Sequence, residues 1–156
     1  MSQPFQATSV PDLAFSANPS GRYLIGSPDA EEHSFDDEAR HEVHLARSFL
    51  IQAPPVTQAQ WRQLMDTEPS RLKGDDKPVE MVSWFDAIAC ANALSRKEGL
   101  PEVYLEDSAP RDDRRSVYET LGYRLPTEAE WEVACRAGTL TVRYRGDVPA
   151  GVAAIG

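Results

Sequence analysis

The sequence predicts an α+β fold of short strands, three helices and long irregular connections. Three helix-capping patterns each precede an apolar stripe at helical spacing, and these predict the helices. Brief stretches in which apolar and polar residues alternate predict the strands. The 12 prolines and 9 glycines in a chain of 156 residues predict many turns and loops between these elements. A chain of this length corresponds to about one domain.

The balance of charge argues against two classes of partner. The chain carries 25 acidic and 16 basic residues, which gives a formal charge of −9. Proteins that bind nucleic acids or anionic membranes use clustered cations, so we expect neither partner. No apolar run has the roughly 18 residues that a membrane span needs. Residues 1–8 lack the basic start and apolar stretch of a signal peptide, so we expect a soluble protein of the cytoplasm.

Short strands are expected in the first third of the chain. Residues 1–20 hold three prolines among small polar residues, and we expect a flexible lead-in to a domain over 21–156. Residues 22–25 form a strand candidate that ends at a Gly-Ser-Pro turn. Apolar residues alternate over 41–45 and again over 49–51, which predicts half-buried strands.

Two polar stretches near these strands contain residue types that can bind metals. Residues 29–38 are acidic but lack the glycine and glutamate spacing of an EF-hand loop, which favours a solvated loop over a cation site. His41 and His44 are one residue too close for a zinc-binding HExxH motif. On a strand they would point to opposite faces, so a surface pair is favoured over a metal site.

Three capping patterns predict the helix starts. Residues 57–60 and 127–130 fit capping boxes, and Ser83 opens a helix whose first turn holds Asp86. The second and third helices are expected to end at glycines, Gly99 and Gly138. The expected apolar faces are Trp61, Leu64 and Met65 in the first helix, Trp84, Ile88, Ala91 and Leu94 in the second, and Trp131, Ala134 and Cys135 in the third.

The large side chains on these elements are predicted to be structural. A tryptophan occupies the first turn of each helix, and this shared placement favours core packing over ligand stacking. Residues 102–119 have little periodicity and are expected to form a long inserted loop. Residues 123–125 predict a short strand before the third helix, with Arg124 between apolar neighbours. A buried arginine must be paired, so we expect Arg124 to form an internal salt bridge with a nearby acid.

The residues alone name no reaction. A catalytic nucleophile needs an oriented base beside it, whereas the three histidines crowd into residues 33–44 among acids. Cys90 and Cys135 match no CxxC spacing and lie on apolar helix stripes. We expect them to behave as small hydrophobes, with a structural or redox role as the alternative. No glycine-rich phosphate-binding motif is present in the sequence.

A long motif near the end of the chain closely resembles a known family. The segment GYRLPTEAEWE at 122–132, followed by ACRAGT at 134–139, is similar to the signature of the formylglycine-generating enzyme family, also called the sulfatase-modifying factor family. Further matches occur in the family's order from about residue 21 to residue 147: IGS at 25–27, DDE at 36–38, HEV at 41–43, FLI at 49–51, PVT at 55–57, QW at 60–61, DKPV at 76–79, VSWFDA at 82–87, NALS at 92–95, GL at 99–100, and Tyr104.

The resemblance implies a helix-rich variant of the C-type lectin fold, of which this chain holds the N-terminal portion. In active family members a cysteine pair binds copper and oxidises a substrate cysteine to formylglycine, and calcium is also bound. Those groups lie in the C-terminal half, so we expect no catalytic, cofactor-binding or metal-binding residue and no cofactor in this chain. The residues expected to carry the structural signature are Arg124, Thr127, Glu128, Glu130, Trp131, Trp84 and Asp86.

Two hypotheses of function follow from this resemblance. The first is a non-catalytic binding or protein-interaction module, whose loops at 29–38 and 102–119 are candidates for binding. The alternative is the N-terminal part of a copper-dependent oxidase that is completed by a further segment or a partner chain. Half of such a core would leave apolar faces around Trp84 and Trp131 uncovered, so we expect a protein partner or a missing C-terminal segment. A degenerate product without selected activity is a third option.

Overall fold

The computed structural model describes residues 5–6, 9–27, 39–105 and 119–138. The chain divides into two compact units, which are described separately. Unit 1 comprises residues 1–17 and 50–125, and unit 2 comprises residues 18–49 and 126–156. The acidic stretch at 29–38 and most of the 102–119 loop, both predicted to lie at the surface, are outside the described residues.

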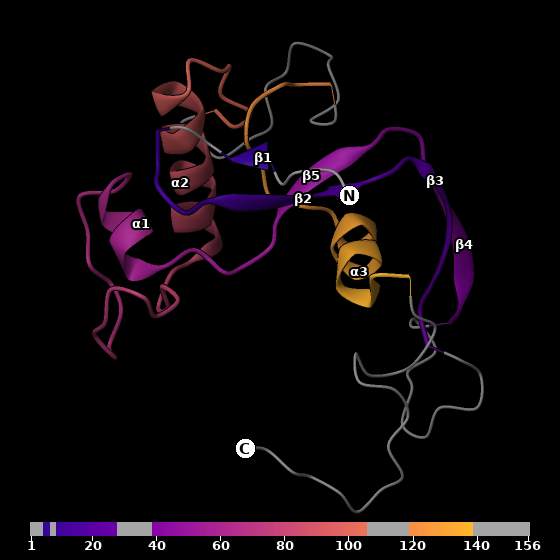
Figure 1. Cartoon of the computed structure of the whole chain (residues 1–156), viewed down its shortest axis with the longest axis horizontal. Helices are drawn as coiled ribbons and strands as arrows, with labels where there is room; N and C mark the ends of the chain where they lie inside the picture. The colour runs from indigo at the N-terminus through magenta and orange to yellow at the C-terminus, as the bar shows by residue number, and fades with distance from the viewer. Residues whose placement is uncertain (1–4, 7–8, 28–38, 106–118, 139–156) are drawn as a thin grey trace, which may run out of the picture. The chain divides into compact units, whose positions relative to one another are not determined.

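A small sheet and two helices make up most of unit 1 (Figure 1). The sheet has the strand order β1-β2-β5, with β1 at Phe5–Gln6, β2 at Ala14–Asn18 and β5 at Phe49–Gln52. Strands β1 and β2 are antiparallel. Helix α1 spans Gln58–Arg62 and helix α2 spans Trp84–Lys97. The strand predicted at 49–51 and both helix starts are therefore confirmed.

The main core of unit 1 includes residues that the sequence suggested were a flexible lead-in. Val10, Leu13 and Phe15 are buried together with Leu94 of α2. Leu64 and Tyr123 pack against this cluster, and the rings of Phe15 and Tyr123 lie 5.7 Å apart. The segment from Val10 onward thus belongs to the core. The prolines around it suggested a loose segment, but its spaced apolar residues have a hydrophobic surface to bury.

Unit 2 joins a two-stranded sheet to helix α3. Strands β3 (Gly21–Ile25) and β4 (His41–Leu45) lie where strands were predicted, and they pair antiparallel with Gly21 opposite Leu45. Helix α3 spans Glu128–Arg136. Its Glu132 carboxylate accepts a hydrogen bond from the Gly26 backbone N–H at 2.8 Å, and Arg136 donates to the Gly26 carbonyl at 2.9 Å. Arg136 and Glu132 also form an ion pair at 2.6 Å. The N–H and the carbonyl of Gly26, which follows β3, are therefore both bound by side chains of α3.

Three local predictions differ from the structure. Residues 123–125 form no strand. Helix α1 ends at Arg62, so Leu64 and Met65 follow the helix and do not lie on it. In α3 the buried residues are Glu130 and Val133, whereas Trp131 and Cys135, which were expected on the buried face, are exposed. The two differences that concern helices have one cause: these helices are short, and tertiary contacts rather than spacing decide which side is buried.

No helix in the part of the chain that the structure describes combines the length and the apolar character needed to cross a bilayer.

Candidate interaction surface

Unit 1 exposes a group of large apolar side chains at the start of α2. Met81 is 72% exposed, Trp84 51% and Phe85 62%, and Leu105 is also exposed. We call these four residues the aromatic surface. Isolated exposed apolar residues are common in soluble proteins, but a tryptophan, a phenylalanine and a methionine within five positions are not. Such a concentration is typical of interaction sites.

The capping box of α2 fixes where Trp84 and Phe85 lie. The Ser83 hydroxyl accepts a hydrogen bond from the Asp86 backbone N–H at 3.2 Å. The Asp86 carboxylate in turn accepts from the Ser83 N–H at 2.8 Å and from its hydroxyl at 2.6 Å. These two hydrogen bonds, chiefly the one from the Ser83 hydroxyl, hold the pKa of Asp86 below its ordinary value. The two aromatic residues occupy the helix turn that this box defines.

Met81 has an unusual backbone conformation just before this turn. Its φ angle is +62°, in the left-handed region that side-chain-bearing residues rarely adopt. A residue held in this region costs about 1 kcal/mol or more, and such costs are concentrated at functional sites. Here the conformation accompanies a methionine whose side chain is mostly in solvent. Burial of the Met81 side chain within unit 1 therefore does not account for this backbone conformation.

Tyr104 supports the aromatic surface from the side of the core. Its ring meets the ring of Trp84 edge to face, with centroids 6.1 Å apart, and Trp84 meets Phe85 in the same manner at 5.4 Å. Aromatic pairs prefer this arrangement because the positive ring edge faces the negative ring face. The Tyr104 hydroxyl accepts a hydrogen bond from the Leu125 N–H at 3.1 Å. Trp84 is thus oriented by its neighbours while half of it remains in water.

Asn92, a buried amide on α2, holds the backbone of Tyr104. Its side-chain NH₂ donates to the Tyr104 carbonyl at 2.8 Å, and its side-chain oxygen accepts from the N–H groups of Val103 and Tyr104, both at 3.2 Å. One turn along, the fully buried Ser95 hydroxyl accepts from the Tyr123 N–H at 2.8 Å. Helix α2 therefore binds the chain on both sides of residues 106–118.

Gly122 and Arg124 begin the motif that carries the family resemblance. A Cβ atom on Gly122 would lie 2.0 Å from the Pro101 carbonyl oxygen, so only glycine fits at this point. Arg124 is half-buried and its guanidinium donates to the Leu125 carbonyl at 3.1 Å. The pairing of Arg124 with an acid stays a prediction.

In unit 2 the remaining signature residues build the start of α3. The Thr127 hydroxyl accepts from the Glu130 N–H at 3.2 Å, and the Glu130 carboxylate accepts from the Thr127 N–H at 2.9 Å. This confirms the predicted capping box, with Glu130 buried and Glu128 exposed. Trp131 is 57% exposed.

The prediction that all three tryptophans pack in the core is wrong for two of them. Trp61 is buried, and its indole N–H donates to the Thr67 hydroxyl at 3.1 Å. Trp84 and Trp131 are each more than half exposed. The sequence pattern shows that a helix has an apolar face, but it does not show that the same chain covers that face.

The described cysteines do not fit the copper site that the family resemblance implies. Burial raises the pKa of the Cys90 thiol to about 11, which disfavours the thiolate that a metal requires. Cys135 is exposed and belongs to the other unit. Among the described residues, no group of three or more His, Cys, Asp or Glu side chains could hold a metal ion. We therefore assign no chemical step to a metal in this part of the chain.

Sequence reasoning named Trp84 and Asp86 but missed the residues around them. Met81, Phe85 and Leu105 did not stand out, because exposure and a positive φ angle leave no pattern in a single sequence. Asn92 did leave a signal, since it is a polar residue close to an apolar helix stripe. A buried amide at such a position has to hydrogen-bond, and here its partners are backbone groups.

Comparison with known proteins places this fold in a family. A model of the sulfatase-modifying factor enzyme 1-like domain matches residues 6–153. The chaperone protein LppX of Paenibacillus barcinonensis is 41% identical over 102 residues, covering 58% of this chain and 36% of that protein. The formylglycine-generating enzyme of Mus musculus is 31% identical over 108 residues, covering 69% of this chain and 22% of that protein. The chain thus spans about a third of the length of the first relative and about a fifth of the length of the second.

A solved structure supports the same assignment. Treponema denticola variable protein 1 superposes with a TM-score of 0.70 at 27% identity, covering 89% of this chain and 58% of the other. The predicted α+β, formylglycine-generating-enzyme-like variant of the C-type lectin fold is confirmed. The chain belongs to the sulfatase-modifying factor enzyme 1-like family.

Proposed function

We propose that this chain is a non-catalytic, formylglycine-generating-enzyme-like module that binds another polypeptide through the aromatic surface of unit 1. The observation that carries the proposal is the half-exposed Trp84, oriented by Tyr104 and flanked by the exposed Phe85 and Met81. Tryptophan dominates the energetics of many protein interfaces, because it brings a large rigid surface at a small entropic cost.

The chemistry of the surface favours a polypeptide over a small ligand. In the described part of unit 1, one small hollow is lined by Trp61, Thr67, Ser70 and their neighbours and has room for about one water molecule. The aromatic surface instead presents side chains outward, and methionine beside aromatic rings adapts to partners of varied shape. The net charge of −9 argues against nucleic acids as the partner.

The names of relatives support binding of a protein in two ways. The Paenibacillus barcinonensis relative is called a chaperone protein, which is a polypeptide-binding role. The mouse relative is called a formylglycine-generating enzyme, whose substrate, by the family resemblance, is a cysteine within a polypeptide. A location in the cytoplasm belongs to the same proposal.

The test is binding of a model client by the full chain. A permanently unfolded, reduced and carboxymethylated protein with a fluorescent label is titrated with the chain, and anisotropy is recorded. We expect Trp84→Ser and Phe85→Ser to weaken binding at least tenfold. Leu121→Ser is the matched control, because Leu121 is also exposed in unit 1 and outside the aromatic surface. Equal affinity of the parent, Trp84→Ser and Phe85→Ser would refute the proposal.

A second candidate function is the N-terminal part of a copper-dependent oxidase that converts a substrate cysteine to formylglycine, completed by a further segment or a partner chain. The exposure of Trp84 and Trp131, both within motifs shared with that family, favours it, because a further segment could cover both. Mass spectrometry separates the two candidates. The chain, purified together with any segment or partner that accompanies it, is incubated with copper, oxygen and a cysteine peptide. An aldehyde product would establish the oxidase and overturn the non-catalytic proposal, and its absence would count against the oxidase.

A further inference from the structure

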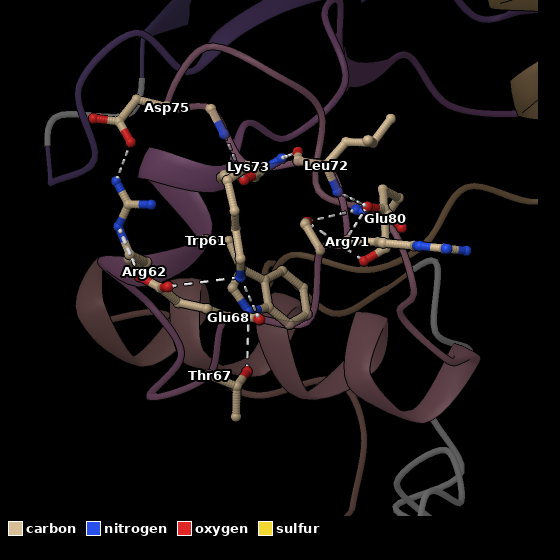
Figure 2. Close-up of polar contacts among 12 residues, drawn as sticks. Trp61, Arg62, Thr67, Glu68, Arg71, Leu72, Lys73, Asp75 and Glu80 are labelled. Carbon is tan, nitrogen blue, oxygen red and sulfur yellow. Dashed lines mark hydrogen bonds and ion pairs between the residues drawn. The ribbon is translucent and has the colours of Figure 1, made fainter.

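The loop between α1 and α2 has a hydrogen-bonded backbone and two exposed side chains at its tip. Residues 68–80, which we call the α1–α2 loop, are drawn in Figure 2 together with the neighbouring part of α1. Arg71 and Leu72 lie at the tip and are exposed, Leu72 to 68%. Loops that carry recognition residues on a fixed scaffold are a common basis of binding sites.

Two side chains hold the loop backbone in place. The Glu80 carboxylate accepts hydrogen bonds from the N–H groups of Arg71 and Leu72, the latter at 3.0 Å. Gln58, which is buried in α1, donates to the Leu72 carbonyl at 2.9 Å and accepts from the Gly74 N–H at 3.1 Å. Both backbone groups of Leu72 are therefore bound within unit 1. The side chains at the tip are presented at little further cost in backbone entropy.

Among the described residues, the Arg71 guanidinium takes part in none of the ion pairs of the loop. Arg62 pairs with Asp75 at 2.6 Å, and Lys73 pairs with Glu68 at 3.7 Å. The Glu80 carboxylate is used by the two N–H groups. In Figure 2 the Arg71 side chain points away from both ion pairs. Within the described residues, Arg71 is the arginine of unit 1 whose guanidinium makes no hydrogen bond or ion pair.

Glu80 connects this tip to the aromatic surface. Its carboxylate binds the backbone of Arg71 and Leu72, and its main chain is joined directly to Met81. A glutamate side chain, one hydrogen bond and one residue step together span roughly 12 Å at most. The backbone of Arg71 and Leu72 therefore lies within about 12 Å of the Met81 Cα atom. The exposed side chains of Leu72, Met81, Trp84 and Phe85 and the cation of Arg71 thus come from neighbouring segments of unit 1.

We infer that the partner segment carries a carboxylate next to large apolar side chains, with the carboxylate bound by Arg71 and the apolar groups bound by Leu72 and the aromatic surface. This inference rests on the proposed function. Arginine binds a carboxylate through two parallel N–H donors, which sets the orientation of the partner as well as its affinity. An unpaired arginine beside exposed apolar groups is the composition that protein interfaces favour.

Three short synthetic peptides with a fluorescent label test the inference on the full chain. The first contains leucine and phenylalanine flanked by glutamate, the second has lysine in place of glutamate, and the third has serine in place of the apolar residues. We expect the first to bind about tenfold more tightly than the second and the third, because each of those lacks one of the two contacts. Arg71→Glu should reverse the preference between the first two. Raising the salt concentration should weaken binding of the first peptide only modestly, because the apolar contacts remain.

Controls separate this inference from the function on which it rests. Lys77→Glu makes the same change of charge at another exposed position of the loop, and we expect less than a twofold effect on every peptide. If the peptides bind, lose affinity in Phe85→Ser and respond equally to Arg71→Glu and Lys77→Glu, the role of Arg71 is refuted and the proposed function stands. If no peptide binds and the chain instead self-associates, both are refuted. Circular dichroism establishes that each variant is folded.

Discussion

Replacing Asn92 by alanine tests how the aromatic surface is held in place. The change removes the partners of three buried backbone groups, namely the carbonyl of Tyr104 and the N–H groups of Tyr104 and Val103. Each lost hydrogen bond of this kind costs about 1 kcal/mol. Alanine returns about 0.6 kcal/mol because it is the better helix former. We therefore expect Asn92→Ala to lower the free energy of unfolding by about 2.5 kcal/mol.

Hydrogen exchange and urea denaturation together measure this effect. We expect the amides of Val103 and Tyr104 to lose protection by roughly seventyfold, which is the equivalent of the lost free energy. The control is Ala89→Asn, which places the same side chain at an exposed position of the same helix. It should cost only the helix propensity of about 0.6 kcal/mol.

A specific result would refute this reasoning. If Asn92→Ala changes the free energy of unfolding no more than Ala89→Asn and leaves both amides protected, then Asn92 does not hold the segment. If instead the amides lose protection, the support of Trp84 by Tyr104 is weakened as well. Binding of the unfolded model client should then fall, although Asn92 is buried and cannot touch the client.

Three further predictions concern the backbone, pH and thiols. Gly122→Ala should lower the free energy of unfolding, measured by urea denaturation, by about 3 kcal/mol or more, because the added Cβ would lie 2.0 Å from a carbonyl oxygen. The control is Gly99→Ala, whose Cβ meets nothing within 4 Å. It should cost about 1 kcal/mol because the φ angle of Gly99 is positive. Because its pKa is lowered on folding, Asp86 stabilises the chain above pH about 4 and loses this effect as the pH falls through the lowered pKa. Asp86→Asn should be less stable than the parent at pH 7 and converge with it in acid-titrated thermal melts. Because burial raises the pKa of Cys90 to about 11, about one Cys90 thiol in a thousand is ionised at pH 8. A thiol reagent should therefore modify the exposed Cys135 first. Equal rates of modification would contradict the burial of Cys90.

Most features that depend on local sequence were predicted correctly, although the strand expected at 123–125 is absent. The capping boxes at 57–60 and 127–130 and the strands at 22–25 and 41–45 are all present. A capping box is decided by two side chains three residues apart, and a strand pair by its alternation. The family resemblance was carried by the same kind of local motif, especially 122–132, and the match over residues 6–153 confirms it.

Features that depend on distant contacts were not predictable. Val10 and Leu13 are core residues because Leu94, far along the chain, packs on them. Trp84 is 51% exposed although it meets the rings of Phe85 and of Tyr104, which lies 20 positions along the chain. In each case the deciding partner is remote in sequence, so spacing and propensity within a window contain no information on it.

The two bonds that α2 makes to the chain on either side of residues 106–118 have a consequence for evolution. Asn92 and Ser95 are less than one helical turn apart, so the two chain ends that they hold stay at a fixed separation, whatever the number of residues between them. Doubling the length of a connection of this kind costs only about 0.6 kcal/mol in closure entropy. A change in the length of this connection is therefore expected to cost little in closure entropy. Evolution has room to vary that length while Asn92 and Ser95 hold the chain on its two sides.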